Sequence, residues 1–310
     1  MEKAVEELTR GKLVAFPTET VYGLGADAAS AGALDLLYQT KGRPRNHPVI
    51  VHLGAPDWLE KWARSNDWAE ALMEAFWPGP LTLILKRAQG VSDQLTGGQD
   101  SVGVRMPSHP LALELLNQFG GGLAAPSANR FGRISPTTAD HVEQEFEGRV
   151  AVLDGGACPV GVESTIVDVS GEVPVLLRPG DITPSQISQV LGRPVAVGGG
   201  AVRAPGTLDS HYAPVTPAFL VPSERLAEVL SQVKANRTGL LSAQPQPIDL
   251  FWLQAEAEPR EYARALYSNL RLLDGAGLQE ILIEAPPQGE AWTAVSDRLA
   301  RATQGFKELK

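Results

Sequence analysis

Short apolar runs alternate with amphipathic stretches over the first two thirds of the chain. The runs predict strands at 13–16, 49–53, 81–85, 102–106 and 164–169. Apolar residues at helical spacing predict helices at 32–40, 58–76, 110–120, 138–146 and 185–192. Thr183 or Ser185 can cap the start of the last helix, and Gly192 can end it. Strands that alternate with helices indicate α/β layers around a sheet.

The alternation stops in the segment 196–217, which is rich in glycine and proline and has no periodicity. A segment of this length without regular structure is a linker or an ordered functional loop. Beyond it, the pattern predicts strands at 218–221, 238–243, 249–253 and 280–285, and helices at 224–234, 259–277 and 294–304. We therefore expect a first domain at 1–195, a linker or lid at 196–217, and a small α/β domain at 218–310.

Composition narrows the class of protein. The 310 residues are 43% hydrophobic and 20% charged, as in globular proteins, and no apolar run is long enough to span a bilayer. The N-terminal segment lacks the apolar core of a signal peptide, so we expect a cytoplasmic protein with no membrane partner. The formal net charge of −9 argues against a surface that coats nucleic acid nonspecifically. The single cysteine, Cys158, excludes an internal disulfide and is expected to be an inert packed thiol.

The familiar nucleotide and hydrolase motifs are absent from the sequence. There is no GxxxxGK[ST] loop, no GxGxxG after a strand, no GxSxG and no HExxH. Any ATP chemistry must therefore use a different phosphate cradle.

Two segments near the N-terminus gather polar groups after predicted elements. The segment 17–25, PTETVYGLG, offers the hydroxyls of Thr18, Thr20 and Tyr22, although it can equally be a strand-to-helix turn. In the segment 41–48, KGRPRNHP, three cations occur within five positions. If the loop bends, Lys41, Arg43 and Arg45 could all face one anion. Such a group of cations suits a triphosphate. The alternative is a solvated run of charge.

Two strands carry unexpected polar residues. Alternation places His52 on the same face as Ile50, where it is either a hydrogen-bonded structural histidine or a ligand contact. Arg105 comes late in its strand and shares a face with Ser101 and Gly103. An arginine among apolar neighbours needs an anion, which can be a structural carboxylate or a substrate.

Further short polar residues occur in two later segments. Ser127, Asn129 and Ser135 lie in a turn-rich stretch at 125–142, where small residues and free amides can form an anion-binding concavity. Ser164 begins a strand and Arg178 ends the next, and hairpin pairing would bring them together. Together, hydroxyls and cations at element ends favour binding of an anionic small molecule over hydrolysis by paired acids.

Six of these segments occur in an order that resembles a known family. They are PTETVYGLGADA, KGRPRNHPVIVHL, SVGVRMPSHP, APSANRFGRISPTTA, GVESTIVDV and LLRPG. In this order they resemble the YrdC-like threonylcarbamoyl-AMP synthase family. HYAP at 211–214, followed by a small α/β domain, resembles the family's two-domain form, and the resemblance covers essentially the whole chain.

The resemblance implies a fold and an activity. The fold would be α/β: a twisted, mixed, open sheet with helices, whose concave face holds both substrates, plus a small Rossmann-like C-terminal domain. The activity would be that of a nucleotidyltransferase that condenses L-threonine, bicarbonate or CO2, and ATP into threonylcarbamoyl-AMP and pyrophosphate. Mg²⁺ would accompany ATP, and the product would pass to tRNA threonylcarbamoyl transferase proteins for the threonylcarbamoyladenosine modification.

The resemblance also implies site residues, with Lys41 and Arg43 neutralising charge during catalysis. The ATP or adenylate site would comprise Lys41, Arg43, His47, Ser101, Ser127, Asn129, Ser135, Arg178 and Tyr212. The L-threonine site would comprise Thr20, His52, Arg105, Ser164 and, through its backbone, Ala125. No residue is assigned to a metal. Many members have asparagine at the position of His47, but histidine can also donate to a phosphate.

Two other functions remain open at this point. The first is an RNA-binding module of the same fold, against which the acidic net charge argues. The second is carbamoyl transfer in metalloenzyme maturation, which would require zinc-finger and acylphosphatase segments, and the chain has no CxxC. The sequence does not identify the base that deprotonates the threonine amine, and His52 is only a candidate.

Overall fold

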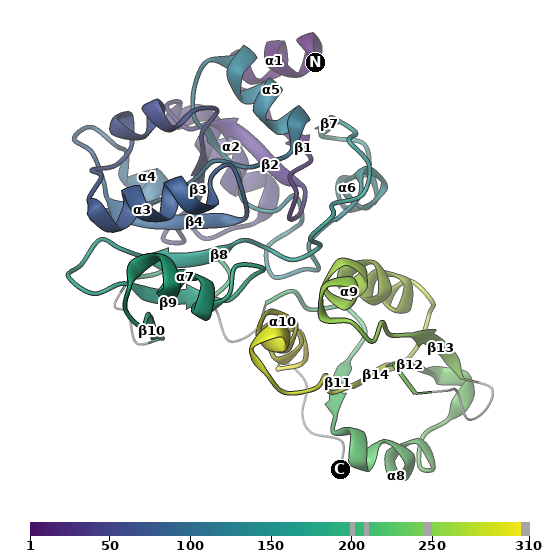
Figure 1. The fold of residues 1–310 in the computed structure, drawn as a ribbon. Coiled ribbons are helices and arrows are strands. Elements are labelled where there is room, and N and C mark those ends of the chain that lie inside the picture. Colours follow the sequence, from purple (N-terminus) through teal and green to yellow (C-terminus); the bar gives the residue numbers. More distant parts are fainter. Residues whose placement is uncertain (199–201, 208–210, 245–249, 305–310) are drawn as a thin grey trace. The chain divides into compact units, whose positions relative to one another are not determined.

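The chain divides into two units in the computed structural model, which describes residues 1–198, 202–207, 211–244 and 250–304 (Figure 1). The first unit comprises Met1–Phe131 and Ser135–Thr207, and the second comprises Gly132–Ile134 and Leu208–Lys310. Each unit has its own sheet and its own packed interior, so each is described by itself.

The first unit is built on one mixed sheet of ten strands (Figure 1). Their spatial order is β10-β9-β8-β4-β5-β3-β6-β2-β1-β7, with parallel and antiparallel neighbours. This agrees with the predicted mixed open sheet. The strands are β1 (Val14–Phe16), β2 (Gly23–Asp27), β3 (Ile50–His52), β4 (Leu81–Lys86), β5 (Ser101–Arg105), β6 (Leu123–Ala124), β7 (Ala151–Val152), β8 (Thr165–Asp168), β9 (Val175–Arg178) and β10 (Ala196–Val197).

Helices cover one face of this sheet and part of the other. They are α1 (Glu2–Thr9), α2 (Ala31–Lys41), the 3-10 helix η1 (Pro56–Lys61), α3 (Asp67–Phe76), α4 (Asp93–Thr96), α5 (Pro110–Phe119), α6 (Ala139–Phe146) and α7 (Pro184–Leu191). Helices α2, α3 and α7 contribute to the main core, whereas α1 and α5 pack with β1 in a separate cluster. The opposite face is therefore left uncovered by helices along the middle strands.

Alternation along β3 shows how the sequence separates the two faces. Val49, Val51 and Leu53 belong to the main core. Ile50 lies on the opposite face in a small cluster with side chains of β4 and β8, and His52 alternates with the core residues in the same way. The face predicted for His52 is thus confirmed.

Two elements differ from the sequence prediction. The helix expected at 58–76 is divided into η1 and α3 because Asn66 caps α3, its side chain accepting a hydrogen bond from the Ala69 amide at 3.0 Å. The segment from Gly23 forms strand β2 rather than a turn into a helix. A Cβ at Gly25 would lie 2.9 Å from the Phe16 ring, so only glycine lets β2 pair this closely with β1.

The expected linker is partly structured. Its first residues form β10, which pairs with β9, and residues 202–207 pack within the first unit. Residues 211–217 belong to the second unit. Residues 199–201 and 208–210 of the expected linker lie outside the described residues.

The second unit is a parallel sheet of four strands in the order β11-β14-β12-β13. This sheet fits the Rossmann-like α/β architecture expected for the C-terminal part. Its elements are β11 (Ala218–Val221), η2 (Ser223–Arg225), α8 (Leu226–Leu230), η3 (Ala235–Arg237), β12 (Thr238–Ser242), β13 (Phe251–Gln254), α9 (Pro259–Asp274), β14 (Glu280–Glu284), η4 (Glu290–Trp292) and α10 (Thr293–Thr303). The helix expected at 224–234 is shortened to α8, and residue 249 of the expected strand at 249–253 lies outside the described residues.

The start of α7 provides a test of the local sequence signals. Thr183 accepts a hydrogen bond from the Gln186 amide at 3.3 Å, and the Gln186 side chain accepts one from the Thr183 amide at 2.9 Å. Gly192 ends the helix in the left-handed conformation, as predicted. These reciprocal bonds satisfy two amides that the first turn leaves open.

We expect Thr183→Ala to lower the free energy of unfolding of the first unit by about 1 kcal/mol, because it removes this cap. Urea unfolding of the full chain, followed by circular dichroism, measures the shift in midpoint. Thr183→Ser keeps the hydroxyl oxygen and should retain most of the stability. Equal losses in the two variants would contradict the cap.

Candidate functional site

The face of the sheet opposite the main core has an apolar cluster in its middle. Ile50, Ile84 and Ile166 come from β3, β4 and β8 and form one buried cluster. Gly103 on β5 lies among them, and a Cβ there would be 3.2 Å from atoms of both Ile50 and Ile84. A larger residue at this position would therefore require these two isoleucine side chains to shift.

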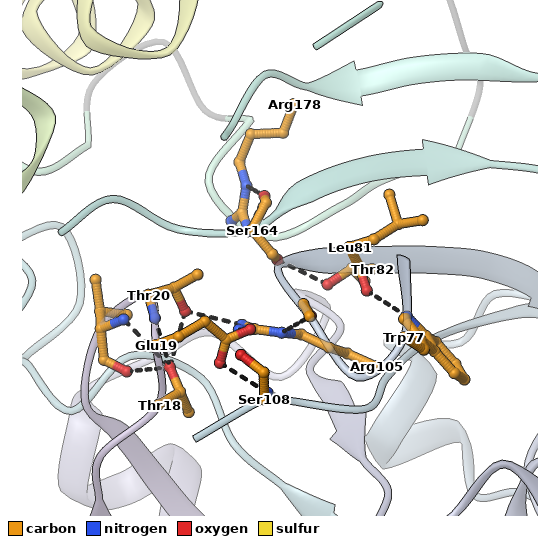
Figure 2. A network of polar contacts seen from close by, with 12 residues as sticks. Thr18, Glu19, Thr20, Trp77, Leu81, Thr82, Arg105, Ser108, Ser164 and Arg178 are labelled. Carbon is orange, nitrogen blue, oxygen red and sulfur yellow. Dashed lines mark hydrogen bonds and ion pairs between the residues drawn. The ribbon is translucent and has the colours of Figure 1, made fainter. Parts of the chain in front are cut away.

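One end of the face is organised by Arg105 (Figure 2). Its guanidinium forms an ion pair with Glu19 at 2.6 Å, donates to the Thr20 hydroxyl at 2.9 Å, and donates to the Gly79 carbonyl at 3.2 Å. The side chains of Arg105 and Glu19 are only 5% and 7% exposed. The structural carboxylate partner that the sequence left open for Arg105 is therefore present.

The loop between β1 and β2 holds Thr20 in place. The Thr18 hydroxyl donates to the Val21 carbonyl at 2.6 Å and accepts from the amides of Thr20 and Val21 at 3.2 Å. The two threonine hydroxyls are 2.8 Å apart, so the Thr20 hydroxyl donates to Thr18 while it accepts from Arg105. Its orientation is thus fixed by its neighbours rather than by solvent.

On the next strands, Ser164 and Arg178 lie together as hairpin pairing predicts (Figure 2). Arg178 donates to the Ser164 carbonyl at 3.1 and 2.9 Å and to its hydroxyl at 3.1 Å. Thr82 on β4 lies 2.7 Å from the same hydroxyl. Thr82 was not among the predicted residues, because a buried threonine in a strand gives no signal of a site.

His52, at the end of β3, is buried. Its ring packs edge-on against Phe16, with ring centroids 6.1 Å apart. Its Nδ1 has no hydrogen-bond partner within the part of the chain that the structure describes. Burial, and then the charge of Arg105, lower the pKa of His52 to about 3, so the imidazole is neutral near pH 7.

The other end of the site is organised by Lys41, at the end of α2. Its ammonium is buried and donates to the Ser127 carbonyl at 2.6 Å and to the Asn129 carbonyl. Burial lowers the pKa of Lys41 well below its usual value, and the charge of Arg43 acts in the same direction, whereas Glu145 opposes it. A bound anion would favour the charged form of this group.

Arg43 lies in the loop that follows. It donates to the carbonyls of Pro48 at 2.7 Å and His47 at 3.3 Å, and its guanidinium lies 5.6 Å from the centre of the Phe131 ring. The His47 ring packs edge-on against the same phenyl ring at 5.2 Å. Burial lowers the pKa of His47, and the charges of Arg43 and Arg203 lower it further.

Arg45 does not face this site, so the prediction that three cations of this segment converge is wrong. Its side chain is 56% exposed and forms an ion pair with Asp35 at 2.6 Å. Arg43 and Arg45 are separated by one proline, yet only Arg43 is buried. Stacking on Phe131 and two carbonyl acceptors distinguish Arg43, and neither feature is visible in the local sequence.

The remaining predicted residues of this unit lie around the same face. Ser101 begins β5 and is buried, and Ser127 is bridged to Gly23 of β2. Ser135 donates to Glu163 at 2.5 Å. Ala125 donates its amide to the Ile50 carbonyl at 3.0 Å.

Tyr212 belongs to the second unit and is therefore not among the residues that the first unit brings together. It is buried, its ring centroid lies 5.8 Å from that of Tyr267, and the Arg298 guanidinium lies 5.2 Å from its ring centre. Its φ of 61° is a left-handed conformation that residues other than glycine rarely adopt. Such a conformation is maintained only where packing fixes it.

Sequence reasoning missed two buried carboxylates, Glu19 and Glu163. Glu19 lies between two threonines of the hydroxyl-rich segment, and Glu163 directly precedes Ser164. Both were visible as charges inside predicted site segments. Their partners, Arg105 and Ser135, are too distant in sequence to be inferred from local pattern.

Two further groups are structural. The Tyr22 hydroxyl donates to the Gly156 carbonyl at 2.8 Å and accepts from the Gly155 amide at 3.1 Å, and burial raises its pKa to about 12. Burial also raises the pKa of the Cys158 thiol to about 12, which suits the inert thiol predicted.

No helix within the described residues is long and apolar enough to cross a membrane.

Comparisons with known proteins give consistent matches along the chain. The Sua5/YciO/YrdC family model, described as telomere recombination, matches residues 6–180. The model of the threonylcarbamoyl-AMP synthase C-terminal domain matches residues 182–304. The threonylcarbamoyl-AMP synthase of Pyrococcus abyssi is 39% identical over 98% of this chain and 93% of its own, and that of Bacillus subtilis is 38% identical over 98% and 92%.

Solved structures agree with these matches. A crystal structure of P. abyssi Sua5 complexed with L-threonine has a TM-score of 0.90 and 37% identity, over 97% of this chain and 93% of that one. Escherichia coli YciO, at 24% identity and a TM-score of 0.51 over 57% of this chain and 87% of its own, shares the fold of the first unit. The chain therefore belongs to the Sua5/YciO/YrdC family, in the form that carries the threonylcarbamoyl-AMP synthase C-terminal domain.

Proposed function

We propose that this protein is an L-threonylcarbamoyladenylate synthase, which makes threonylcarbamoyl-AMP and pyrophosphate from L-threonine, bicarbonate or CO2, and ATP for tRNA modification. One observation carries the proposal: the first unit holds a buried Lys41–Arg43 pair and, separately, a buried Arg105 that pairs with Glu19. Ammonium and guanidinium groups held at two places suit two anionic substrates, a polyphosphate and an amino-acid carboxylate.

The threonine substrate is assigned to the Arg105 end. Its carboxylate would share the Arg105 guanidinium with Glu19, and Thr20 keeps a lone pair for an N–H donor. Ser164 would contribute its hydroxyl, and Ala125 its carbonyl oxygen. The complex of P. abyssi Sua5 with L-threonine, at 37% identity, supports an amino-acid site in this fold.

The polyphosphate of ATP is assigned to the end with Lys41 and Arg43. The other predicted ATP residues in this unit are His47, Ser101, Ser127, Asn129, Ser135 and Arg178. Lys41 and Arg43 donate to backbone carbonyls, which orient both side chains. Oriented, poorly hydrated cations stabilise developing phosphate charge better than water does.

The reaction then needs two bond-forming steps. The neutral amine of threonine attacks the carbon of CO2 and loses a proton, which gives N-carboxythreonine. A carboxylate oxygen of this carbamate attacks the α-phosphorus of ATP, and the bond to the β-phosphate oxygen breaks to release pyrophosphate. This second step makes the enzyme a nucleotidyltransferase, and the protein contributes alignment and charge stabilisation.

His52 is poorly suited to deprotonate the amine. An efficient general base has a pKa near the working pH, whereas the pKa of His52 is lowered to about 3. We therefore assign His52 as a neutral hydrogen-bonding partner of threonine, and the open Nδ1 is the atom it offers.

Mg²⁺ is assigned to ATP rather than to the protein. Within the described residues, no group of three His, Cys, Asp or Glu side chains could hold a metal ion. The polyphosphate end offers ammonium, guanidinium and imidazole groups, which suit phosphate oxygens but not a cation. Mg²⁺ would enter as the ATP complex, bound mainly through phosphate oxygens and water, and would neutralise phosphate charge.

We also propose that the chain works as a catalytic domain at 1–195, a linker or lid at 196–217 and a C-terminal domain at 218–310. The lid would exclude water from the mixed anhydride, which hydrolyses readily. Tyr212 would contact the adenylate from this segment. The product would pass to tRNA threonylcarbamoyl transferase proteins.

The overall reaction is tested by measuring pyrophosphate release with ATP, threonine and bicarbonate each omitted in turn. Release should require all three, and mass spectrometry should detect threonylcarbamoyl-AMP. Release without threonine, or no release with the complete mixture, would contradict the proposed activity. RNA retention on a filter without any pyrophosphate release would instead support an RNA-binding module.

Lys41→Ala and Arg43→Ala should each abolish most pyrophosphate release, with a loss of roughly 2–5 kcal/mol in transition-state stabilisation. The control is Arg45→Ala, which removes an equal charge from the same loop but lies outside the site. Its kcat/KM should stay near that of the wild type. Near-normal release by either of the first two variants would refute the phosphate assignment.

Glu19→Gln should raise the KM for threonine, because the neutral amide no longer holds the Arg105 guanidinium in position for the substrate carboxylate. Removal of one partner of a buried pair also costs roughly 3–5 kcal/mol of stability. The matched control is Glu6→Gln, because Glu6 pairs with Arg10 at an exposed position. This substitution should change the free energy of unfolding by less than about 1 kcal/mol. Steady-state kinetics and urea unfolding measure both effects, and an unchanged KM for threonine would argue against Arg105 as the carboxylate site.

A further inference from the structure

Part of the aperiodic segment after β10 is docked on the open face of the first unit. Ala204 is buried in the cluster of Ile50, Ile84 and Ile166, and Val202 packs against the same cluster. Arg178 donates to the Pro205 carbonyl at 2.9 Å, which ties the segment to the end of β9. The segment thus packs on the apolar cluster of this face.

Gln99 holds the backbone of Arg203 between these two anchors. The Arg203 amide donates to the Gln99 side-chain oxygen at 2.7 Å, and the Gln99 side-chain nitrogen donates to the Arg203 carbonyl at 3.0 Å. A side-chain amide therefore satisfies both backbone groups of one residue, as a neighbouring strand would. This pairing fixes the position of residue 203 whatever its side chain.

The Arg203 guanidinium is directed at the loop that carries the phosphate cations. It donates to the Gly97 carbonyl at 2.8 Å. A Cβ at Gly97 would be 2.6 Å from the Asn46 carbonyl, so this turn lies directly against the loop between Arg43 and Pro48. The Arg203 side chain is exposed, and it forms no ion pair with a described residue.

The charge of Arg203 reaches His47. Both Arg203 and Arg43 lower the pKa of this imidazole, after the larger effect of burial. Arg43 and Arg203, from two separate segments, therefore both place positive charge near the His47 imidazole. An anion bound between these two guanidinium groups would interact favourably with both.

We infer that Arg203 is a further polyphosphate-binding residue of this site and that Gln99 is its positioning residue. The inference rests on the proposed function, because it takes the nucleotide to be the ligand of Arg43 and His47. Arg203 groups with these residues rather than with Arg105 and Thr20. It should therefore contact the β- and γ-phosphates, and neither the adenosine nor threonine.

The test is calorimetric titration of the full chain with ATP, ADP and AMP, without threonine. Arg203→Ala should weaken ATP binding about tenfold, the lower range for a hydrogen bond between charged groups at an exposed position. The variant should lose less affinity for ADP than for ATP, and it should bind AMP as tightly as the wild type does. Arg10→Ala, which removes an equal exposed charge from α1, is the control and should bind all three normally.

Gln99→Ala tests the positioning role through a double-mutant cycle. If Gln99 acts only through Arg203, the double variant should bind ATP no more weakly than Arg203→Ala alone. The KM for threonine should stay unchanged in all variants, which a general loss of structure would not allow. Additive losses in the double variant would overturn the positioning role.

Pyrophosphate release, measured on the same samples, separates the two proposals. Wild-type turnover together with unchanged ATP affinity in Arg203→Ala would overturn the assignment of Arg203 and leave the proposed function intact. An equal loss of affinity for ATP and AMP would also overturn it, because the effect would not come from the phosphates. ATP binding that Arg203→Ala weakens, without any threonine-dependent release, would support Arg203 and refute the proposed function.

Discussion

A guanidinium buried beneath an open sheet face needs an anion, and in the first unit Glu19 supplies it to Arg105. Desolvating such a charge without a partner costs several kcal/mol, so this pair constrains everything around it. It ties the end of β5 to the loop between β1 and β2, and its second bond orients Thr20. Because the guanidinium is immobile before any ligand arrives, a carboxylate substrate would find its partner already in place.

The basic side chains at the two ends of the face are held in place in different ways. At the first end, the positive charge of Arg105 is matched by a carboxylate, so that end is ordered and close to neutral. At the second, Lys41 and Arg43 donate to backbone carbonyls, which orient both side chains. Phosphates carry more charge than an amino-acid carboxylate, so two basic side chains at one end and one at the other match the difference between the proposed substrates.

The sequence predicted the features that depend on residues close to one another along the chain. Alternation placed Ile50 and His52 on one face, and hairpin pairing placed Arg178 beside Ser164. It did not predict which of two adjacent cations turns inward, because stacking on Phe131 selects Arg43 and Asp35 holds Arg45 outside. The role of Glu19 was missed for the same reason: a charge between two threonines gives no indication of the distant arginine that it meets. The sequence showed which residue types could form the site. Only the folded structure shows which of these residues pair with one another.

The segment after β10 shows a further limit of pattern analysis. Its lack of periodicity indicated either a linker or an ordered functional loop, and the structure docks residues 202–205 on the sheet through Gln99 and Arg178, which are distant in sequence. Gln99 binds only the backbone of residue 203, so these two docking bonds do not depend on its side chain. The Arg203 side chain adds one bond, to the Gly97 carbonyl, and carries a charge that suits an anionic ligand. An aperiodic segment whose backbone is held by side chains from elsewhere can contribute to a site as specifically as a strand does, although no local pattern marks it.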